Sequence, residues 1–141
     1  MIVPDLNLLI YAYDQDSEFH SRAQLWWTNL VNGEETVCLP WAVTLGFLRI
    51  TTSHRIMANP WPIESAIRTV GAWFDYRAIR PIDPGGAHLR LVSELLEPIG
   101  VGAKLVTDAH LAALAIENRA VLHTHDRDFE RFIGVRIFDP L

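Results

Sequence analysis

The sequence is poor in cysteine, in lysine and in long apolar segments. Its one cysteine, Cys38, cannot form an internal disulfide bond, and a lone thiol is typical of a reducing compartment. No apolar run approaches the roughly 18 residues that cross a bilayer. The first residues also lack the basic segment that opens a signal peptide. We therefore expect a cytoplasmic protein that does not enter a membrane.

The charge balance is acidic, with 12 basic residues against 17 acidic ones and a formal net charge of −5. A protein that coats duplex nucleic acid by neutralising its phosphates is usually basic, so that class is disfavoured. Lys104 is the only lysine, and the remaining positive charge comes from arginines, which pair well with phosphate and carboxylate groups. Contact with RNA or with an acidic partner therefore stays open.

Half of the 141 residues are hydrophobic, which is enough for one substantial core, and we expect residues 1–141 to form a single domain. The expected strands cover residues 1–3, 37–39, 78–82, 120–124 and 135–138. The expected helices follow Asp5 and cover about residues 20–30, 41–52, 63–74, 87–96 and 106–118. This alternation predicts an α/β fold with a central, mainly parallel sheet covered on both faces. In such folds the functional crevice lies beyond the carboxyl ends of the strands.

Three aspartates are expected at that edge of the sheet. Asp5 follows the first strand, Asp126 follows the strand over residues 120–124, and Asp108 or Thr107 is expected to open the preceding helix. If the first and fourth strands are neighbours, the three carboxylates face one crevice. Like charges so close together repel one another and raise each other's pKa unless a cation neutralises them. Oxygen ligands without thiolates select Mg²⁺ or Mn²⁺.

Each of these aspartates also has an ordinary structural interpretation. Taken alone, Asp5 or Asp108 is typical of a helix N-cap, and Asp126 and Asp128 are equally typical of a turn. Three such aspartates meeting at one edge of a sheet are less expected by chance. The convergence of all three, rather than any one of them, indicates a metal site.

The segments that carry these aspartates resemble a known family. Asp5 stands in VPDLNLLIYAYD, Asp108 in LVTDAHLAALAIE and Asp126 in THDRDFERF, and the chain closes with FDPL. Together with LPWAVTLGFLRITT, over residues 39–52, these motifs resemble the PIN domain along essentially the whole chain. The closest resemblance is to the VapC-type ribonuclease toxin of type II bacterial toxin–antitoxin pairs. A D-x-N motif alone is unspecific, whereas TDAHLAALA followed by THDRDF at this distance is specific.

The resemblance implies a three-layer α/β/α PIN-like fold, Mg²⁺-dependent endoribonuclease activity with Mn²⁺ able to substitute, a homodimer, and a cognate antitoxin that embraces the toxin. By match to the family motifs, Asp5, Asp108 and Asp126 are the catalytic, metal-binding acids. We expect Asp5 and Asp108 to be direct ligands, and Asp126 to act through water or to orient the nucleophile. The implied reaction is hydrolysis of an RNA phosphodiester by water that the ion activates. Structured RNA such as transfer RNA is the first expected substrate.

Further residues are expected around this set. Those expected beside the acids are Asp128, Thr124 and Thr107, and those expected to contact RNA are Arg49, Arg55 and Arg127. Arg49 and Arg55 belong to a basic cluster for which a solvated surface is the default and phosphate contact the alternative. Arg127 either pairs with the neighbouring acids or touches RNA.

One position departs from the family pattern. Many PIN domains carry a further acid in the helix after the second strand, where Gly46 stands here, and no acid occurs between Glu35 and Glu64. Two cations about 3.5–4 Å apart need more anionic ligand, so we expect one well-held ion. A PIN-like module that binds RNA or protein without cutting is therefore the alternative function. A nuclease that acts on DNA with the same acids stays open, whereas a receiver-type phosphoacceptor domain is disfavoured because Asp5 has no acidic neighbour.

The segment HTHDRDF suggests zinc at first sight, because His123 and His125 stand two residues apart. The hydrolase pattern H-x-H-x-D fails, since Arg127 occupies the position that needs aspartate. We expect His123 to end a core strand, and we assign no role to His125. The remaining histidines that show no ligand spacing are His20, His88 and His110.

Two adjacent tryptophans are unusual on one helix. Trp26 and Trp27 lie about 100° apart around the helix axis, so both cannot point squarely into one core face. We expect one of them in the core and the other half-covered, or anchoring a partner, because tryptophan is enriched at interaction hot spots.

Overall fold

The computed structural model describes residues 1–141 and contains one five-stranded sheet. The strands are β1 (Ile2–Pro4), β2 (Val37–Pro40), β3 (Ile79–Ile82), β4 (Val121–His123) and β5 (Arg136–Phe138). Their spatial order is β3-β2-β1-β4-β5, and every pair is parallel. Since β1 and β4 are hydrogen-bonded neighbours, the expectation that the first and fourth strands are adjacent is confirmed.

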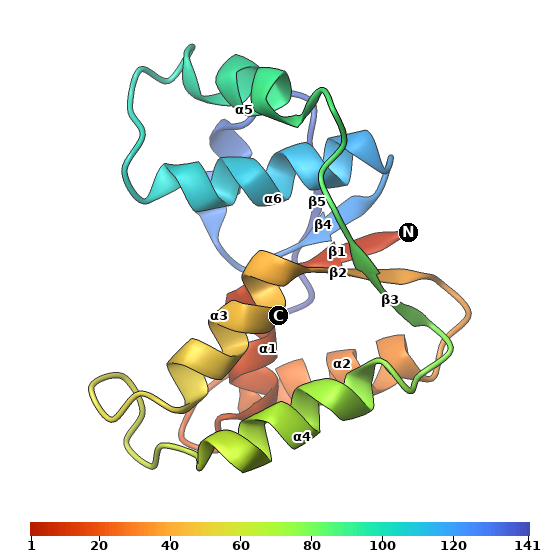
Figure 1. Ribbon diagram of the computed structural model, residues 1–141, viewed down its shortest axis with the longest axis vertical. Coiled ribbons are helices and arrows are strands. Elements are labelled where there is room, and N and C mark those ends of the chain that lie inside the picture. The colour runs from red at the N-terminus through yellow and green to blue at the C-terminus, as the bar shows by residue number, and fades with distance from the viewer.

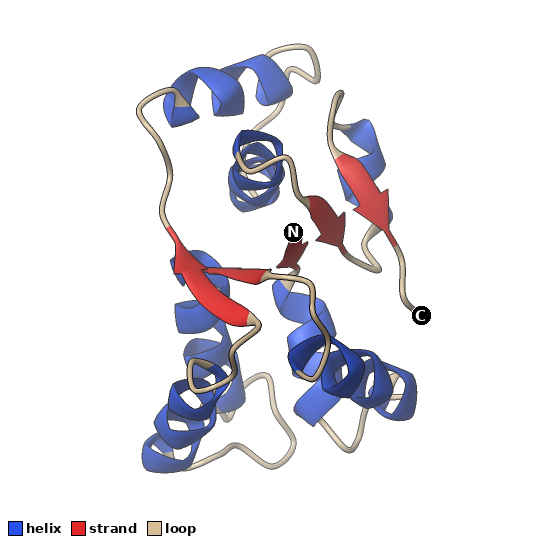
Figure 2. Ribbon diagram, turned by 90° about the vertical axis from the view of Figure 1, so that its right-hand side faces the viewer, coloured by secondary structure: helices blue, strands red, loops and turns tan.

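Helices cover both faces of this sheet. They are α1 (Leu6–Tyr13), α2 (His20–Val31), α3 (Trp41–Thr51), α4 (Ile63–Trp73), α5 (His88–Leu96), α6 (Leu105–Glu117) and the short 3₁₀ helix η1 (Arg127–Arg131). Helices α5 and α6 lie on one face, and α1 to α4 lie on the other (Figure 1). Figure 2 shows the strands as a layer between these two groups, so the expected three-layer α/β/α architecture is confirmed. None of the helices combines the length and the hydrophobicity that crossing a membrane requires.

Apart from His123 at the end of β4, the central strands consist of apolar residues, as expected for strands with both faces buried. Ile2 pairs in register with Val121, and Val3 pairs with Leu122. Successive side chains alternate between the two faces of a strand, so each of these pairs contributes to the core on a different face. Helix α6 contacts both strands. It is buried along most of its length, which explains why its sequence is apolar nearly all round rather than amphipathic.

An aromatic cluster fills the layer formed by α1 to α4. The Tyr13 hydroxyl accepts hydrogen bonds from Trp27 Nε1 at 3.2 Å and from Trp73 Nε1 at 2.8 Å. Trp26 turns instead toward the sheet, where its Nε1 donates to His123 Nδ1 at 3.0 Å. Trp26 and Trp27 are therefore both buried, at 8% and 5% exposure. The expectation that one of them is half-covered was wrong, because each indole finds its own polar partner in a different part of the core.

Candidate functional site: a carboxylate cluster at the strand ends

Asp5 is the most deeply placed carboxylate of the site. It follows β1 directly and stands at the N-cap position of α1, but its side chain makes no capping hydrogen bond. Its backbone N–H donates to His123 O at 2.8 Å, which extends the contact between β1 and β4 by one residue. The side chain is only 5% exposed. The end of the strand therefore sets the position of this buried carboxylate.

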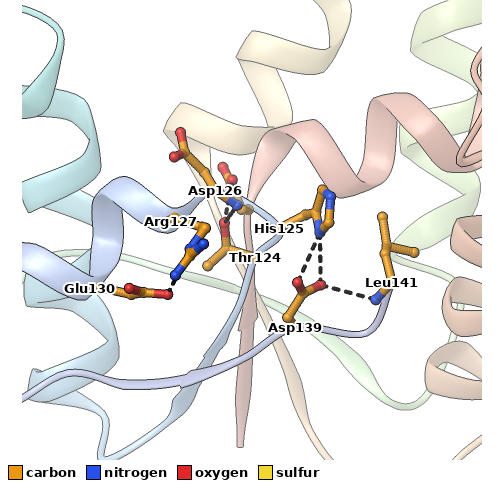
Figure 3. A network of polar contacts seen from close by, with 8 residues as sticks. Thr124, His125, Asp126, Arg127, Glu130, Asp139 and Leu141 are labelled. Carbon is orange, nitrogen blue, oxygen red and sulfur yellow. Dashed lines mark hydrogen bonds and ion pairs between the residues drawn. The ribbon is translucent and has the colours of Figure 1, made fainter.

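Thr124 connects the ends of the two central strands. Its Oγ1 donates to Asp5 Oδ2 at 2.9 Å and accepts the backbone N–H of Asp126 at 3.0 Å. Asp126 in turn caps η1, since its Oδ1 accepts the N–H of Asp128 at 2.8 Å. Figure 3 shows this turn, with Thr124 beneath Asp126 at the end of β4. The hydroxyl expected at Thr124 thus lies in direct contact with one acid and positions the backbone of another.

Asp108 reaches the same place from α6. The helix was expected to open at Thr107 or Asp108, but it begins at Leu105, so Asp108 lies inside its first turn. The backbone turns before Leu105, with Ala103 at a φ of 50° and the N–H of Leu105 donating to Gly102 O at 3.0 Å. This turn starts the helix earlier than the polar residues suggested. Asp108 keeps the favourable position near the N-terminus of a helix, where the helix dipole stabilises negative charge.

The structure brings three carboxylates within reach of one ion. Oxygen atoms of Asp108, Asp126 and Asp128 all lie within 4.8 Å of one another. Asp5 lies deeper and interacts electrostatically with Asp108 and Asp126. Asp128 is thus closer to the centre of the cluster than expected, while the division into direct and water-mediated ligands stays a prediction.

Burial and the neighbouring negative charges make two of the carboxyl groups, those of Asp5 and Asp108, harder to ionise. Burial, opposed by the hydrogen bond from Thr124, raises the pKa of Asp5 above its ordinary value. Burial, followed by the charges of Asp5, Asp126 and Asp128, raises the pKa of Asp108 to about 6. Lys104 opposes this shift without cancelling it. At neutral pH the repulsion between the ionised carboxylates therefore destabilises the folded protein, and a cation bound among their oxygens would remove this repulsion.

The donor set fits a hard divalent cation. All of the available ligands are carboxylate oxygens, and no thiolate or imidazole joins the group within 4.8 Å. Such ligands favour Mg²⁺ or Mn²⁺ over zinc or copper. The three carboxylates together carry more charge than Lys104 alone can balance, so their chemistry suits an ion of charge +2.

Lys104 is a part of the site that sequence analysis missed. Its Nζ lies 3.0 Å from Asp128 Oδ2, and the pKa of Lys104 is raised, first by the hydrogen bond to Asp128. The lysine precedes α6 and the aspartate lies on η1, so nothing in their spacing of 24 residues indicated the contact. The only signal was that the chain has a single lysine.

The other residues expected near the acids lie farther out. Thr107 is exposed in the first turn of α6 and makes no side-chain hydrogen bond. Arg49 lies in the last turn of α3 and Arg55 in the loop after it. This end of α3 points away from α6 and η1 (Figure 1). Arg127 does not pair with Asp126, because its Nε lies 3.3 Å from Glu130 Oε1 and the side chain points the other way (Figure 3).

Gly46 is buried at a close approach of α3 to α1. A Cβ atom added at this position would lie 2.6 Å from Leu6 Cδ2. Leu6 directly follows Asp5, so a side chain at position 46 would shift the end of a leucine that neighbours the site.

The histidines have structural partners that the sequence did not reveal. His125 Nδ1 lies 2.9 Å from Asp139, which links the C-terminal residues to the turn after β4 (Figure 3). His88 and His110, which showed no ligand spacing in the sequence, meet in the fold, with Nε2 of the first 2.7 Å from Nδ1 of the second. Glu117 lies 3.2 Å from His88 Nδ1 and completes a polar link between α5 and α6. Of these residues only His125 belongs to the HTHDRDF segment, and its ring lies against a carboxylate of the C-terminal residues.

Comparison with known proteins settles the family. The family model described as "PIN domain" matches residues 2–134. The chain belongs to the PIN-domain family. Within it, the sequence is 40% identical over 141 residues to "Ribonuclease VapC33" of Mycobacterium tuberculosis, covering 100% of this chain and 99% of that protein. It is also 37% identical over 140 residues to "Ribonuclease VapC37" of the same species, covering 99% and 97% of the two chains. The protein is thus a PIN-domain member of the VapC group.

Solved structures agree with the fold. The structure of VapC20 from Mycobacterium tuberculosis, described as a sarcin–ricin loop cleaving toxin, aligns with a TM-score of 0.69 at 15% identity, over 96% of this chain and 99% of that one. A chain of the DNA-bound VapBC2 complex from Rickettsia felis aligns with a TM-score of 0.70 at 18% identity, over 98% of both chains. At these identities the likeness establishes the fold, and this fold places the strand-end acids together.

Proposed function

We propose that this PIN-domain protein is the toxin of a type II toxin–antitoxin pair, a cytoplasmic endoribonuclease that depends on Mg²⁺. The observation that carries the proposal is the carboxylate cluster. A buried Asp5, held by Thr124, lies beside the three acids whose oxygens fall within 4.8 Å of one another. Forty per cent identity to a protein named as a ribonuclease supports the activity.

Asp108, Asp126 and Asp5 are the residues proposed to hold the ion, with Asp128 beside them. A divalent ion bound there would supply Lewis acidity toward a phosphate oxygen and would lower the pKa of a water molecule. The chain itself contributes orientation, because Thr124 holds the carboxylate of Asp5 and the turn that carries Asp126. Lys104 restrains Asp128 and reduces the net charge that an approaching phosphate meets.

A partly exposed aromatic surface next to the acids is the proposed RNA contact. The rings of Tyr11 and Phe19 lie 5.1 Å apart, and those of Phe19 and His125 lie 4.8 Å apart. The guanidinium of Arg22 stands 5.5 Å from the centre of the Phe19 ring. His125 directly precedes Asp126, and the charges of Asp5 and Asp126 are felt at Tyr11, so this surface borders the cluster. Aromatic side chains stack with unpaired bases, which suits single-stranded or looped RNA.

An exposed apolar face on α3 and α4 is the proposed place for protein partners. Its large exposed side chains are Trp41, Leu45, Ile63 and Ile67. Such groups on neighbouring helices are typical of interaction surfaces, and α3 and α4 contact each other. Solved VapBC complexes support an antitoxin partner. The homodimer expected from the resemblance would use a surface of the same kind.

The test is expression of wild type and of Asp5→Asn in bacteria, with growth and RNA integrity as the two measurements. We expect wild type to arrest growth and to produce discrete RNA fragments, and Asp5→Asn to do neither. Asp75→Asn is the matched control, because Asp75 is an exposed aspartate outside the cluster, and it should behave like wild type. Equal toxicity of wild type and Asp5→Asn, at equal protein levels, would contradict the proposed mechanism.

A PIN-like module that binds RNA without cutting is the second candidate, and the buried Gly46 is the observation that favours it. Purified wild type with Mn²⁺ and single-stranded RNA distinguishes the two. RNA cleavage favours the nuclease, whereas RNA binding without cleavage favours the module. Parallel digestion of single-stranded DNA tests whether the activity is specific for RNA.

A further inference from the structure

One pocket of the molecule is lined by none of the carboxylates of the cluster. A pocket of about 420 Å³ lies between the C-terminal end of α2 and the β1, β4 and β5 strands. Its apolar walls come from Ile2, Leu30, Val121 and Phe138. The volume lies within the roughly 300–1,000 Å³ of small-molecule sites, and none of the site carboxylates lines it.

The polar group of this pocket is His123, and its protonation state follows from a single contact. Trp26 Nε1 carries a hydrogen and can only donate, and it lies 3.0 Å from His123 Nδ1. Nδ1 must therefore be the acceptor, which places the proton of the neutral ring on Nε2.

The Nε2–H group of His123 has no partner in the protein. The residue is 8% exposed and lines the pocket, and its one side-chain hydrogen bond is the contact to Trp26. Glu117 Oε1 is the one fully buried side-chain atom without a partner, so His123 Nε2 is not sealed in the core and is accessible from the pocket that the residue lines. A fixed, neutral donor that faces a pocket is the type of group that orients a small ligand.

The rim of the pocket is acidic. Glu34 and Glu35 both line it. Glu35 lies 3.9 Å from the N-terminal ammonium of Met1, which balances part of its charge, whereas Glu34 forms no ion pair. The uncompensated carboxylate favours a donor or a cation on the ligand and repels phosphate.

Phe138 offers an exposed aromatic ring to a flat ligand in the pocket. The rings of His123 and Phe138 have their centroids 4.8 Å apart and are tilted by 50°. Phe138 remains 50% exposed although it lies on the same side of β5 as the pocket. A planar ring placed in the pocket would cover this exposed face, and aromatic contacts of this kind add to simple burial.

We propose that this pocket binds an amino-substituted nitrogen heterocycle of the nucleobase type, as the base or the nucleoside rather than the nucleotide. A ring nitrogen or carbonyl of the ligand accepts from His123 Nε2–H. Its amino group donates to the carboxylates of Glu34 and Glu35. A phosphate on the ligand would meet the same carboxylates and be repelled.

The test is a titration of the full-length chain with adenosine, inosine and AMP, followed by NMR. The reporter is the indole N–H signal of Trp26, which contacts the ring that donates to the ligand and can be assigned with Trp26→Phe. EDTA in the buffer keeps divalent ions away, so the result does not depend on the proposed ribonuclease activity. We expect adenosine to shift the Trp26 signal to saturation. Inosine, which lacks the amino group, and AMP should each bind about fivefold more weakly or worse, as loss of one hydrogen bond predicts.

Glu34→Gln should weaken adenosine binding by about fivefold, and Glu97→Gln is the matched control, since Glu97 is exposed at the end of α5. Both are surface changes that leave the core intact. The proposal is overturned if adenosine causes no saturable shift, if inosine or AMP binds as tightly as adenosine, or if Glu34→Gln binds adenosine like wild type. The first of these outcomes would also mean that any natural occupant belongs to another chemical class.

Discussion

Thr124 Oγ1 donates to Asp5 Oδ2 at 2.9 Å and thereby joins the ends of β4 and β1 inside the carboxylate cluster. The same oxygen accepts the backbone N–H of Asp126. One buried hydroxyl thus stabilises the ionised form of the deepest acid and fixes the turn that presents the next one. A side chain with both a donor and an acceptor is required at this position.

Replacing Thr124 with valine keeps the shape of the side chain and removes both hydrogen bonds. Because the partners are buried, we expect the free energy of unfolding to fall by about 1–3 kcal/mol. The pKa of Asp5 should rise further, since the Thr124 bond is what lowers it. Thr124→Ser restores the hydroxyl and should recover most of the RNA cleavage at pH 7.5. If valine and serine lose activity equally, the hydroxyl is not what matters at this position.

The raised pKa of Asp108 predicts a pH-dependent difference between two proteins. Its folded pKa of about 6 lies above the ordinary 3.8, so the metal-free folded state binds more protons between these values. Asp108 therefore costs stability as pH rises through 6, and removal of its charge should help. We expect Asp108→Asn to melt at a higher temperature than wild type at pH 7.5, and this difference to shrink toward pH 5. The gain is on the order of 1 kcal/mol after allowance for solvent screening.

The comparison with Asp108→Asn is necessary because the pKa shift of His123 changes the stability of the fold with pH in the opposite direction. Its folded pKa of about 4 lies below the ordinary 6.5, so the unfolded state binds more protons in that window. Wild-type stability therefore loses a contribution as pH falls from 6.5 to 4. In wild type, protonation of Asp108 offsets part of this loss. Asp108→Asn lacks that offset, so its melting temperature should fall more steeply on acidification. A difference between the two proteins that does not change with pH would contradict the shift assigned to Asp108.

Metal binding should compete with protonation of the same carboxylate. Mn²⁺ needs Asp108 ionised, so the increase in melting temperature that it causes should be larger at pH 7.5 than at pH 5.5. Asp108→Asn should show little or no increase at either pH, and the exposed Asp75→Asn should follow wild type. An equal Mn²⁺ effect in Asp108→Asn would place the ion elsewhere.

The strand-end acids could be predicted from the sequence because they follow from a general rule of parallel sheets. Asp5 directly follows β1 and Asp126 lies three residues after the end of β4. The carboxyl ends of neighbouring parallel strands meet at one edge of the sheet. The order of β1 and β4 then brings the two residues together. The start of the helix that carries Asp108 was placed two or three residues too late, because the turn at Gly102 and Ala103 carries no strong sequence signal.

Contacts that depend on the packing of separate elements could not be predicted. Lys104 and Asp128 meet because the start of α6 lies beside η1. His88 and His110 meet across the interface of α5 and α6, although their spacing of 22 residues in the sequence does not indicate a contact. Such pairs are determined by where helices cross, which local patterns of hydrophobic and polar residues do not specify.

Gly46→Glu restores the acid that many PIN domains carry and tests why it is missing. The new side chain must displace Leu6, whose Cδ2 would lie 2.6 Å from the added Cβ, and it adds a buried charge near the cluster. We expect a lower melting temperature without metal, and a larger Mn²⁺-induced increase than in wild type. Gly46→Ala is the control. Its methyl group requires only a small shift of Leu6, and alanine stabilises a helix by about 1 kcal/mol relative to glycine. A Gly46→Glu protein as stable as Gly46→Ala without metal would show that Leu6 gives way freely.

Phe19→Ala tests the aromatic surface as a contact for RNA bases. Phe19 lies between Tyr11 and His125 and touches none of the acids, so its loss should leave kcat almost unchanged. Loss of one stacked base is worth about 1–3 kcal/mol, and the KM for single-stranded RNA should therefore rise about fivefold or more. Phe19→Tyr keeps the ring and should restore the KM, while Tyr76→Ala removes an exposed ring elsewhere and should change neither constant. A fall in kcat at constant KM would instead show that Phe19 supports the position of the acids, because a stacking platform acts on binding and a structural support acts on the chemical step.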